Sequence, residues 1–151
     1  MTITPFLWFD TQAEEAMTYY ASVFEHSKVK AVNRAQGRVM TVEFELQGQP
    51  LMALNGGPHF KFTEAISLFV SCETQAEIDR LWARFIGDGG SPSQCGWLKD
   101  KFGLSWQIIP STLGSLLSGG GDAARAGRVL NAMLQMNKLD VAQLQRAYAG
   151  E

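Results

Sequence analysis

A four-residue segment that occurs twice constrains the fold of this chain most strongly. The tetrapeptide Thr-Gln-Ala-Glu stands at residues 11–14 and again at residues 74–77, an offset of 63 residues. Each copy follows a short apolar run rich in β-forming residues and precedes apolar residues at helical spacing. Because the two copies share their place at a strand-to-helix junction, they indicate an internal duplication. One structural unit is therefore expected twice.

Both copies also predict the same way of starting a helix. In each copy a threonine stands three residues before a glutamate: Thr11 before Glu14, and Thr74 before Glu77. In a capping box, the threonine hydroxyl and the glutamate carboxylate accept hydrogen bonds from backbone N–H groups at the helix start. The sequence thus predicts a capping box at both junctions.

The first repeat has the pattern of one strand, one helix and three further strands. Apolar side chains at every second position from Met40 to Leu46 alternate with polar ones, which predicts a strand with one buried face. The expected elements are a strand over residues 3–9, a helix over 13–24, and strands over 27–34, 39–46 and 51–54.

The second repeat begins after the Asn-Gly-Gly-Pro break at residues 55–58 and is less regular around Pro92. Its expected elements are a strand over residues 65–72, a helix over 74–86, and strands over 95–98 and 104–109. A helical turn over 112–117, a flexible glycine break at 119–121, a helix over 122–136 and a last helix from Asp140 follow. These helices belong to neither repeat and are expected to cover the repeats or a partner subunit.

The whole chain is expected to form a single domain, residues 1–151, of the α+β class. It comprises two repeated βαβββ modules, at about residues 1–55 and 64–110, and C-terminal helices at about residues 112–149.

Composition excludes several classes of function. The net charge of −2 and the dispersed basic residues speak against a nucleic-acid partner. No apolar run approaches the roughly 20 residues that cross a bilayer, so no membrane partner is expected. The N-terminal residues show no secretory signal pattern. Cys72 and Cys95 are too few for a disulfide framework, so both are expected as reduced thiols in a cytoplasmic protein.

Four stretches of the sequence resemble one protein family. They are Thr4–Asp10, Leu54–Phe62, Cys95–Gln107 and Arg128–Met136, of which Cys-Gly-Trp-Leu-Lys-Asp-Lys-Phe-Gly is the most specific. They resemble the PhnB-like branch of the vicinal oxygen chelate superfamily, which includes glyoxalase I, bleomycin-resistance proteins and extradiol dioxygenases. Members of that branch often carry the label "3-demethylubiquinone-9 3-methyltransferase domain". The resemblance implies paired glyoxalase-like modules whose sheets form a cavity, and a homodimer.

The resemblance also directs attention to metal ligands. Metal-dependent members of the superfamily hold their ion with four His or Glu side chains from the first and last strands of the two modules. The matching positions, with the neighbours that a one-residue slip brings in, hold Thr2, Ile3, Thr4, Met52, Ala53, Leu54, Ala65, Ile66, Ser67 and Gln107. Glu64 is the one nearby carboxylate, and a divalent cation needs several His or carboxylate ligands. We expect no bound metal.

The methyltransferase label finds no support in the residues. Common methyltransferases bind their cofactor at a glycine-rich turn between a strand and a helix. The glycines at 119–121 instead lie between two helical segments, so no cofactor is expected.

In the resembling fold, strand alternation directs a mostly apolar set of side chains toward a cavity. The candidate substrate-binding residues are Trp8, Phe9, Asn55, Phe60, Ser67, Phe69, Trp106 and Gln107. The alternative is that these rings fill the core. Phe60-Lys61-Phe62 forms either a rim at which Lys61 meets an anion or a solvated loop with two anchoring rings. His26 and His59 are read as surface residues, with a general base at His59 as the alternative.

No complete catalytic or metal-ligand set emerges, so the sequence leaves open whether the protein is an enzyme. The function it predicts is metal-independent binding of a small, partly apolar molecule in the β-cavity. One alternative is a metal-dependent lyase, isomerase or dioxygenase of the same superfamily. The other is an interaction module with a vestigial cavity.

Overall fold

A computed structural model describes residues 1–151. The chain divides into two compact units, Met1–Phe62 and Thr63–Glu151. Each unit contains one repeat, and the second also contains the C-terminal helices.

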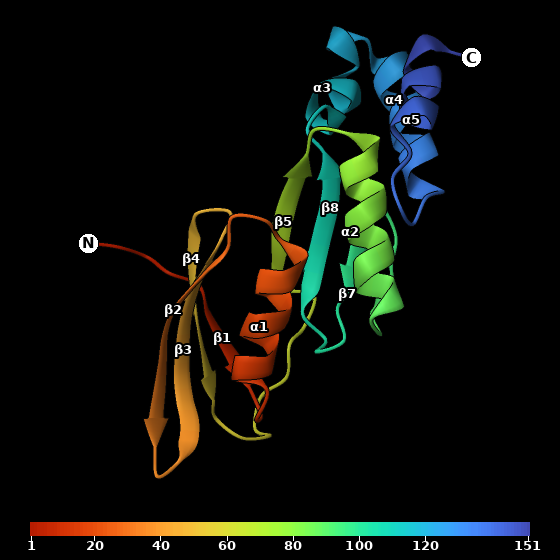
Figure 1. Ribbon diagram of the computed structural model, residues 1–151. Coiled ribbons are helices and arrows are strands. Elements are labelled where there is room, and N and C mark those ends of the chain that lie inside the picture. The colour runs from red at the N-terminus through yellow and green to blue at the C-terminus, as the bar shows by residue number, and fades with distance from the viewer. The chain divides into compact units, whose positions relative to one another are not determined.

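The first unit is a four-stranded sheet with one helix (Figure 1). Its elements are β1 (Phe6–Phe9), α1 (Ala13–Val23), β2 (Lys28–Ala35), β3 (Arg38–Leu46) and β4 (Gln49–Asn55). The strand order is β1-β4-β3-β2. Helix α1 connects the two edge strands, and β2, β3 and β4 return as antiparallel neighbours, so that β4 runs parallel to β1.

The core of the first unit lies between this sheet and α1. Val42, Phe44 and Leu46 alternate along β3 as buried residues, as the sequence pattern predicts. The ring of Phe44 stacks on that of Tyr20 from α1, with centroids 6.4 Å apart. Met40 was expected on the same buried face but is half exposed, so burial along β3 begins at Val42.

The second unit repeats this arrangement. Its elements are β5 (Ser67–Cys72), α2 (Gln75–Gly87), β6 (Ser91–Pro92), β7 (Trp97–Lys99) and β8 (Ser105–Pro110). The strand order β5-β8-β7-β6 matches that of the first unit, and β5 again pairs in parallel with the last strand. The α+β fold with two βαβββ modules is thereby confirmed. The sequence pattern did not show β6, which is only two residues long and contains a proline without a backbone N–H.

The two Thr-Gln-Ala-Glu segments start their helices differently. In the second copy, Thr74 Oγ1 accepts from the backbone N–H of Glu77, whose side chain accepts from Thr74 N, so the predicted capping box is present. Helix α1 instead begins one position later in the tetrapeptide, at Ala13, and no side chain caps it from Gln12. The prediction of a first capping box was wrong. The side chain of Asn55 fills that role, because its Oδ1 accepts from Ala13 N at 2.8 Å.

The C-terminal helices form a small core of their own with the end of β8. They are α3 (Leu113–Ser118), α4 (Ala123–Leu134) and α5 (Val141–Ala149), and they gather at one end of the second unit in Figure 1. Their buried residues are Ile109, Leu113, Val129, Met136, Leu139 and Leu144. None of the helices in the chain is long and apolar enough to cross a membrane.

The glycines at 119–121 form a tight turn between α3 and α4, not the flexible break that was expected. Gly119 and Gly120 both have φ of +62°. A Cβ at Gly119 would lie 2.6 Å from the backbone nitrogen of Ala126, so only glycine fits there.

The C-terminal segment is bonded to the second module at two places. The side-chain amide of Gln75 donates to Leu139 O at 3.0 Å and accepts from Val141 N at 2.8 Å. Next to β7, Cys95 N donates to Met136 O at 2.8 Å and Gly96 N donates to Asn137 O at 2.7 Å. The helices therefore cover their own second module, which is one of the two expected arrangements.

Candidate functional site

A buried carboxylate shapes the turn between β7 and β8. Asp100 Oδ1 accepts from the backbone N–H groups of Phe102 and Leu104 at 2.8 and 3.1 Å, and Oδ2 accepts from Trp106 Nε1 at 2.9 Å. The ring of Trp106 packs against that of Phe85 from α2, with centroids 5.0 Å apart. The most specific family stretch thus acts structurally through Asp100. Trp106, a cavity candidate, is 2% exposed and lies on the helix-covered face of the sheet.

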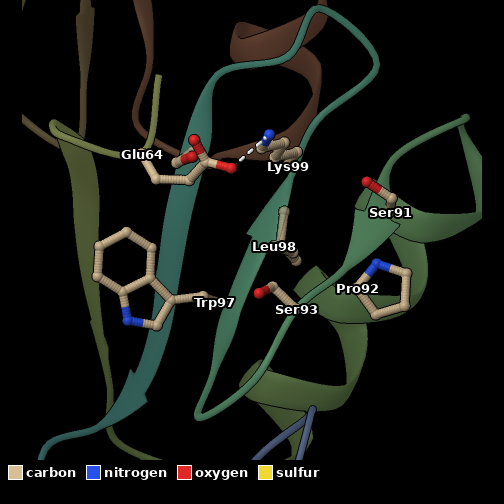
Figure 2. Close-up of a pocket in the computed structure, with 8 residues that line it drawn as sticks. Glu64, Ser91, Pro92, Ser93, Trp97, Leu98 and Lys99 are labelled. Atoms are coloured by element: carbon tan, nitrogen blue, oxygen red, sulfur yellow. Dashed lines mark ion pairs between the residues drawn. The ribbon is translucent and has the colours of Figure 1, made fainter. Parts of the chain in front are cut away.

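The opposite face of this sheet contains a pocket, which we call the Ser105 pocket. Its volume is about 230 Å³. Eight residues from the segment before β5 and from β6, β7, β8 and their loops line it: Glu64, Ser91, Pro92, Ser93, Trp97, Leu98, Lys99 and Ser105. Figure 2 shows Glu64 and Lys99 at one end of the pocket and the indole of Trp97 toward the other.

The Ser105 side chain is an unsatisfied polar group in this pocket. Ser105 is 1% exposed, and its Oγ has no hydrogen-bond partner in the protein. Leaving a buried hydroxyl without a partner costs about 1–3 kcal/mol. A group that enters the pocket and bonds to Oγ would recover that free energy, so Ser105 is the residue that best marks a binding site.

An ion pair lies at the pocket's end. Lys99 Nζ and Glu64 Oε1 are 2.6 Å apart, and their side chains are 40% and 63% exposed. The hydrogen bond from Lys99 is the largest cause that lowers the pKa of Glu64, so the Glu64 carboxyl group is charged at neutral pH. The pocket therefore offers one cation whose partner is a solvent-exposed carboxylate.

Two of the predicted cavity residues meet beside this pocket. Gln107 Nε2 donates to Ser67 Oγ at 2.9 Å, across the parallel pair of β8 and β5. Phe69 is the register partner of Gln107 and is largely exposed. Ser67, Phe69 and Gln107 thus lie together on the face of the sheet opposite α2.

The chain matches one family over most of its length. The sequence model of the family described as 3-demethylubiquinone-9 3-methyltransferase matches residues 1–109. The chain belongs to this family. The match covers both modules and ends within β8, so that α3, α4 and α5 lie outside the matched residues.

Several solved structures are similar to this chain. A putative 3-demethylubiquinone-9 3-methyltransferase, PhnB protein, from Bacillus cereus is 35% identical, with a TM-score of 0.67 over 73% of this chain and 99% of its own. Protein PA1353 from Pseudomonas aeruginosa is 21% identical, with a TM-score of 0.58 over 70% of this chain and 94% of its own. A glyoxylase/bleomycin resistance protein/dioxygenase domain from Frankia sp. EAN1pec is 15% identical, with a TM-score of 0.49 over 70% of this chain and 88% of its own.

The family match and the Bacillus cereus PhnB protein together show that the chain is PhnB-like. No functionally curated protein matches the chain.

The donor set of this chain does not fit the metal centre that the resemblance implies. At the positions to which the resemblance assigns ligands, the second unit provides the hydroxyl of Ser67 and the amide of Gln107, bonded to each other. No three His, Cys, Asp or Glu side chains of the chain come together. A neutral hydroxyl and amide bring no charge to offset the dehydration of a divalent cation.

The family name does not lead to a methyltransferase site either. The glycines at 119–121 follow the matched residues and form the turn between α3 and α4. A Cβ at Gly120 would lie 2.8 Å from the Tyr148 hydroxyl, so the turn packs against α5. The backbone of residues 119–121 thus packs between helices and does not form a loop between a strand and a helix.

The candidates in the first unit have structural partners. Trp8 Nε1 donates to Gly57 O at 2.9 Å, and Asn55 holds the start of α1 and donates to Val39 O. Phe9 is 3% exposed, and strand alternation places it with Asn55 on the α1 side of the sheet, opposite Trp8.

The Phe60-Lys61-Phe62 triplet holds β1 from both sides. The ring of Phe60 meets Trp8 edge-on at 4.9 Å, and that of Phe62 meets Phe9 at 5.2 Å. Since Trp8 and Phe9 face opposite ways, the two rings anchor the loop. This favours the reading of a solvated loop with two anchoring rings.

Two histidines and two cysteines remain. His26 and His59 are both exposed and belong to separate loops. Both cysteines are free thiols. Cys95 Sγ lies 3.6 Å from Met133 O, and Cys72 is buried at the end of β5.

The two thiols are predicted to differ in reactivity. Burial raises the pKa of Cys72 to about 11. Since the thiolate is the reactive form, only about one Cys72 in a thousand is reactive at pH 8. We expect iodoacetamide to alkylate the half-buried Cys95 first at pH 8, and Cys72 to react faster only as the pH rises toward its pKa. Peptide mass spectrometry measures both sites, and Cys95→Ser isolates Cys72. Equal rates at pH 8 in the folded protein would contradict the prediction.

Proposed function

We propose that this protein binds a small, partly apolar molecule in the Ser105 pocket and that no metal takes part. The observation that supports this most directly is the Ser105 hydroxyl, a buried polar group that lines the pocket and has no partner. The resemblance supports it too, because it implies paired modules whose sheets form a cavity.

The lining of the pocket defines the size and character of the ligand. A volume of about 230 Å³ accommodates one ring with a polar substituent. The Trp97 indole offers an apolar wall, while Ser105 and Lys99 offer hydrogen-bond donors. Neither histidine and neither cysteine lines the pocket, and Ser105 Oγ forms no hydrogen bond to a general base. The proposal is therefore binding without catalysis.

A fragment screen by two-dimensional NMR tests the proposal. We expect small aromatic fragments with a polar group to shift the Trp97 indole and Ser105 amide signals in a saturable way. The Ser105→Ala variant should weaken these fragments about tenfold, as for a lost hydrogen bond to a buried group. Ser71→Ala, at an exposed position on β5, is the matched control and should leave binding unchanged. A screen without any saturable shift in the pocket would contradict the proposal.

The metal content of the purified protein tests the second part of the proposal, that no metal takes part. Purified protein is expected to contain far less than one equivalent of Zn, Ni, Mn or Fe. A near-stoichiometric amount would instead favour the metal-dependent lyase, isomerase or dioxygenase reading. The homodimer that the resemblance implies stays a prediction, and light scattering measures it.

A further inference from the structure

The strands around the Ser105 pocket align four polar side chains across the sheet. In the register of the strands, Ser67 pairs with Ser105, Ser105 with Lys99, and Lys99 with Ser91. Register partners on adjacent strands point to the same face, with Cβ atoms about 5 Å apart. The result is a polar row of three hydroxyls and one ammonium group that crosses β5, β8, β7 and β6.

The next row on the same face is mostly aromatic. Gln107 pairs with Phe69 on one side and with Trp97 on the other. This aromatic row lies two residues along the strands from the polar row. A molecule that spans both rows meets hydrogen-bond donors and a cation at one end and a ring at the other.

We propose that the ligand of the Ser105 pocket is an aromatic carboxylate and that its carboxylate replaces that of Glu64 on Lys99. This inference rests on the proposed function and adds the ligand class and a competitor within the chain. The ligand ring would lie against Trp97, and its carboxylate would accept from Lys99 Nζ and Ser105 Oγ. Ser105 then acquires the partner that it lacks.

Glu64 is suited to be displaced. Its side chain is 63% exposed and comes from the segment before β5, outside the regular strands. An exposed ion pair contributes little stability, because water solvates both charges well. The ligand brings a carboxylate of its own, so Lys99 keeps a counter-ion when the exposed Glu64 side chain moves into solvent.

Charge substitutions and a pair of probes test the inference. The probes are benzoate and benzamide, which share one ring and differ in charge, titrated into the full chain and followed at the Trp97 indole signal. Glu64→Gln should tighten benzoate about fivefold by removing the competitor, and Lys99→Gln should weaken it about tenfold. Lys99→Arg keeps the cation and should retain most of the affinity for benzoate. Benzamide should change less than about twofold in all three variants.

The chain provides a matched control. Lys138 and Asp79 form another exposed ion pair of 2.6 Å in the same unit, outside the pocket. Asp79→Asn changes the net charge as Glu64→Gln does and should leave benzoate binding unchanged.

The outcomes separate this inference from the proposed function. Benzoate that binds no tighter to Glu64→Gln than to the wild type overturns the inference. So does a fragment screen in which neutral fragments bind in the pocket and no carboxylate does, and in both cases small-molecule binding stands. A screen with no ligand in the pocket overturns both.

Discussion

Replacing Asp100 with alanine is expected to lower the free energy of unfolding of the second unit by about 3 kcal/mol or more. The carboxylate accepts from two backbone N–H groups and from the Trp106 indole, in a place where Asp100 is 4% exposed. Alanine leaves all three donors without an acceptor, and each unsatisfied buried group costs about 1–3 kcal/mol, not fully additively. Urea unfolding measures the loss, and hydrogen exchange at Phe102 and Leu104 localises it.

Two further variants make the Asp100 prediction specific. Asp100→Asn keeps one acceptor oxygen and places an NH₂ group opposite another donor. We therefore expect its free energy of unfolding to lie between those of the wild type and Asp100→Ala. Asp10→Ala, at an exposed position after β1, should change stability by less than about 1 kcal/mol. If Asp100→Ala lowered the free energy of unfolding no more than Asp10→Ala does, the hydrogen bonds to Asp100 would not stabilise the second unit as we predict.

Replacing Gln75 with alanine is expected to loosen the C-terminal helices, at a cost of about 1–2 kcal/mol. The amide bonds to Leu139 O and Val141 N at the start of α5, and no other side chain bonds to these two groups. Gln75→Glu keeps an acceptor for Val141 N but sets a carboxylate oxygen against Leu139 O, so it should cost at least as much. Hydrogen exchange in α4 and α5 should speed up more than exchange in β8.

The duplication supplies the control for Gln75. Gln12 is the same residue of the other Thr-Gln-Ala-Glu copy, and it precedes α1 without capping it by a side-chain hydrogen bond. Gln12→Ala should therefore change stability by less than about 0.5 kcal/mol. Equal effects of Gln12→Ala and Gln75→Ala would show that the contacts to α5 contribute nothing measurable.

The architecture was predictable because its signals are local. Strand alternation, helical spacing and the repeated tetrapeptide together predicted two βαβββ modules, and the family match and strand orders confirm them. The start of α1 was not predictable, because its cap comes from Asn55, 42 residues away in the sequence. The tetrapeptide is identical in the two copies, but at α1 the capping hydrogen bond comes from a side chain that is distant in the sequence.

The candidate site was predictable only in part, again because distant parts of the chain form it. Alternation along β8 pointed to Gln107, and extending it by two residues would have reached Ser105 on the same face. The two-residue strand β6 carries no periodic signal, so Ser91 could not be placed beside Lys99. Trp106 looked like a cavity ring because composition does not say which face of a strand is covered; the helix α2 decides that.

The bonds from the C-terminal segment to Cys95 and Gly96 give the tail a part in shaping the backbone beside Trp97, which lines the Ser105 pocket. Gly96 has no room for a side chain: a Cβ there would lie 2.7 Å from the Ile109 side chain and 3.1 Å from that of Leu139. The backbone beside Trp97 is therefore shaped by residues that follow the family match at residue 109. Relatives that share both modules but have different tails after β8 are expected to differ in the shape of the pocket wall. They are therefore expected to select different ligands.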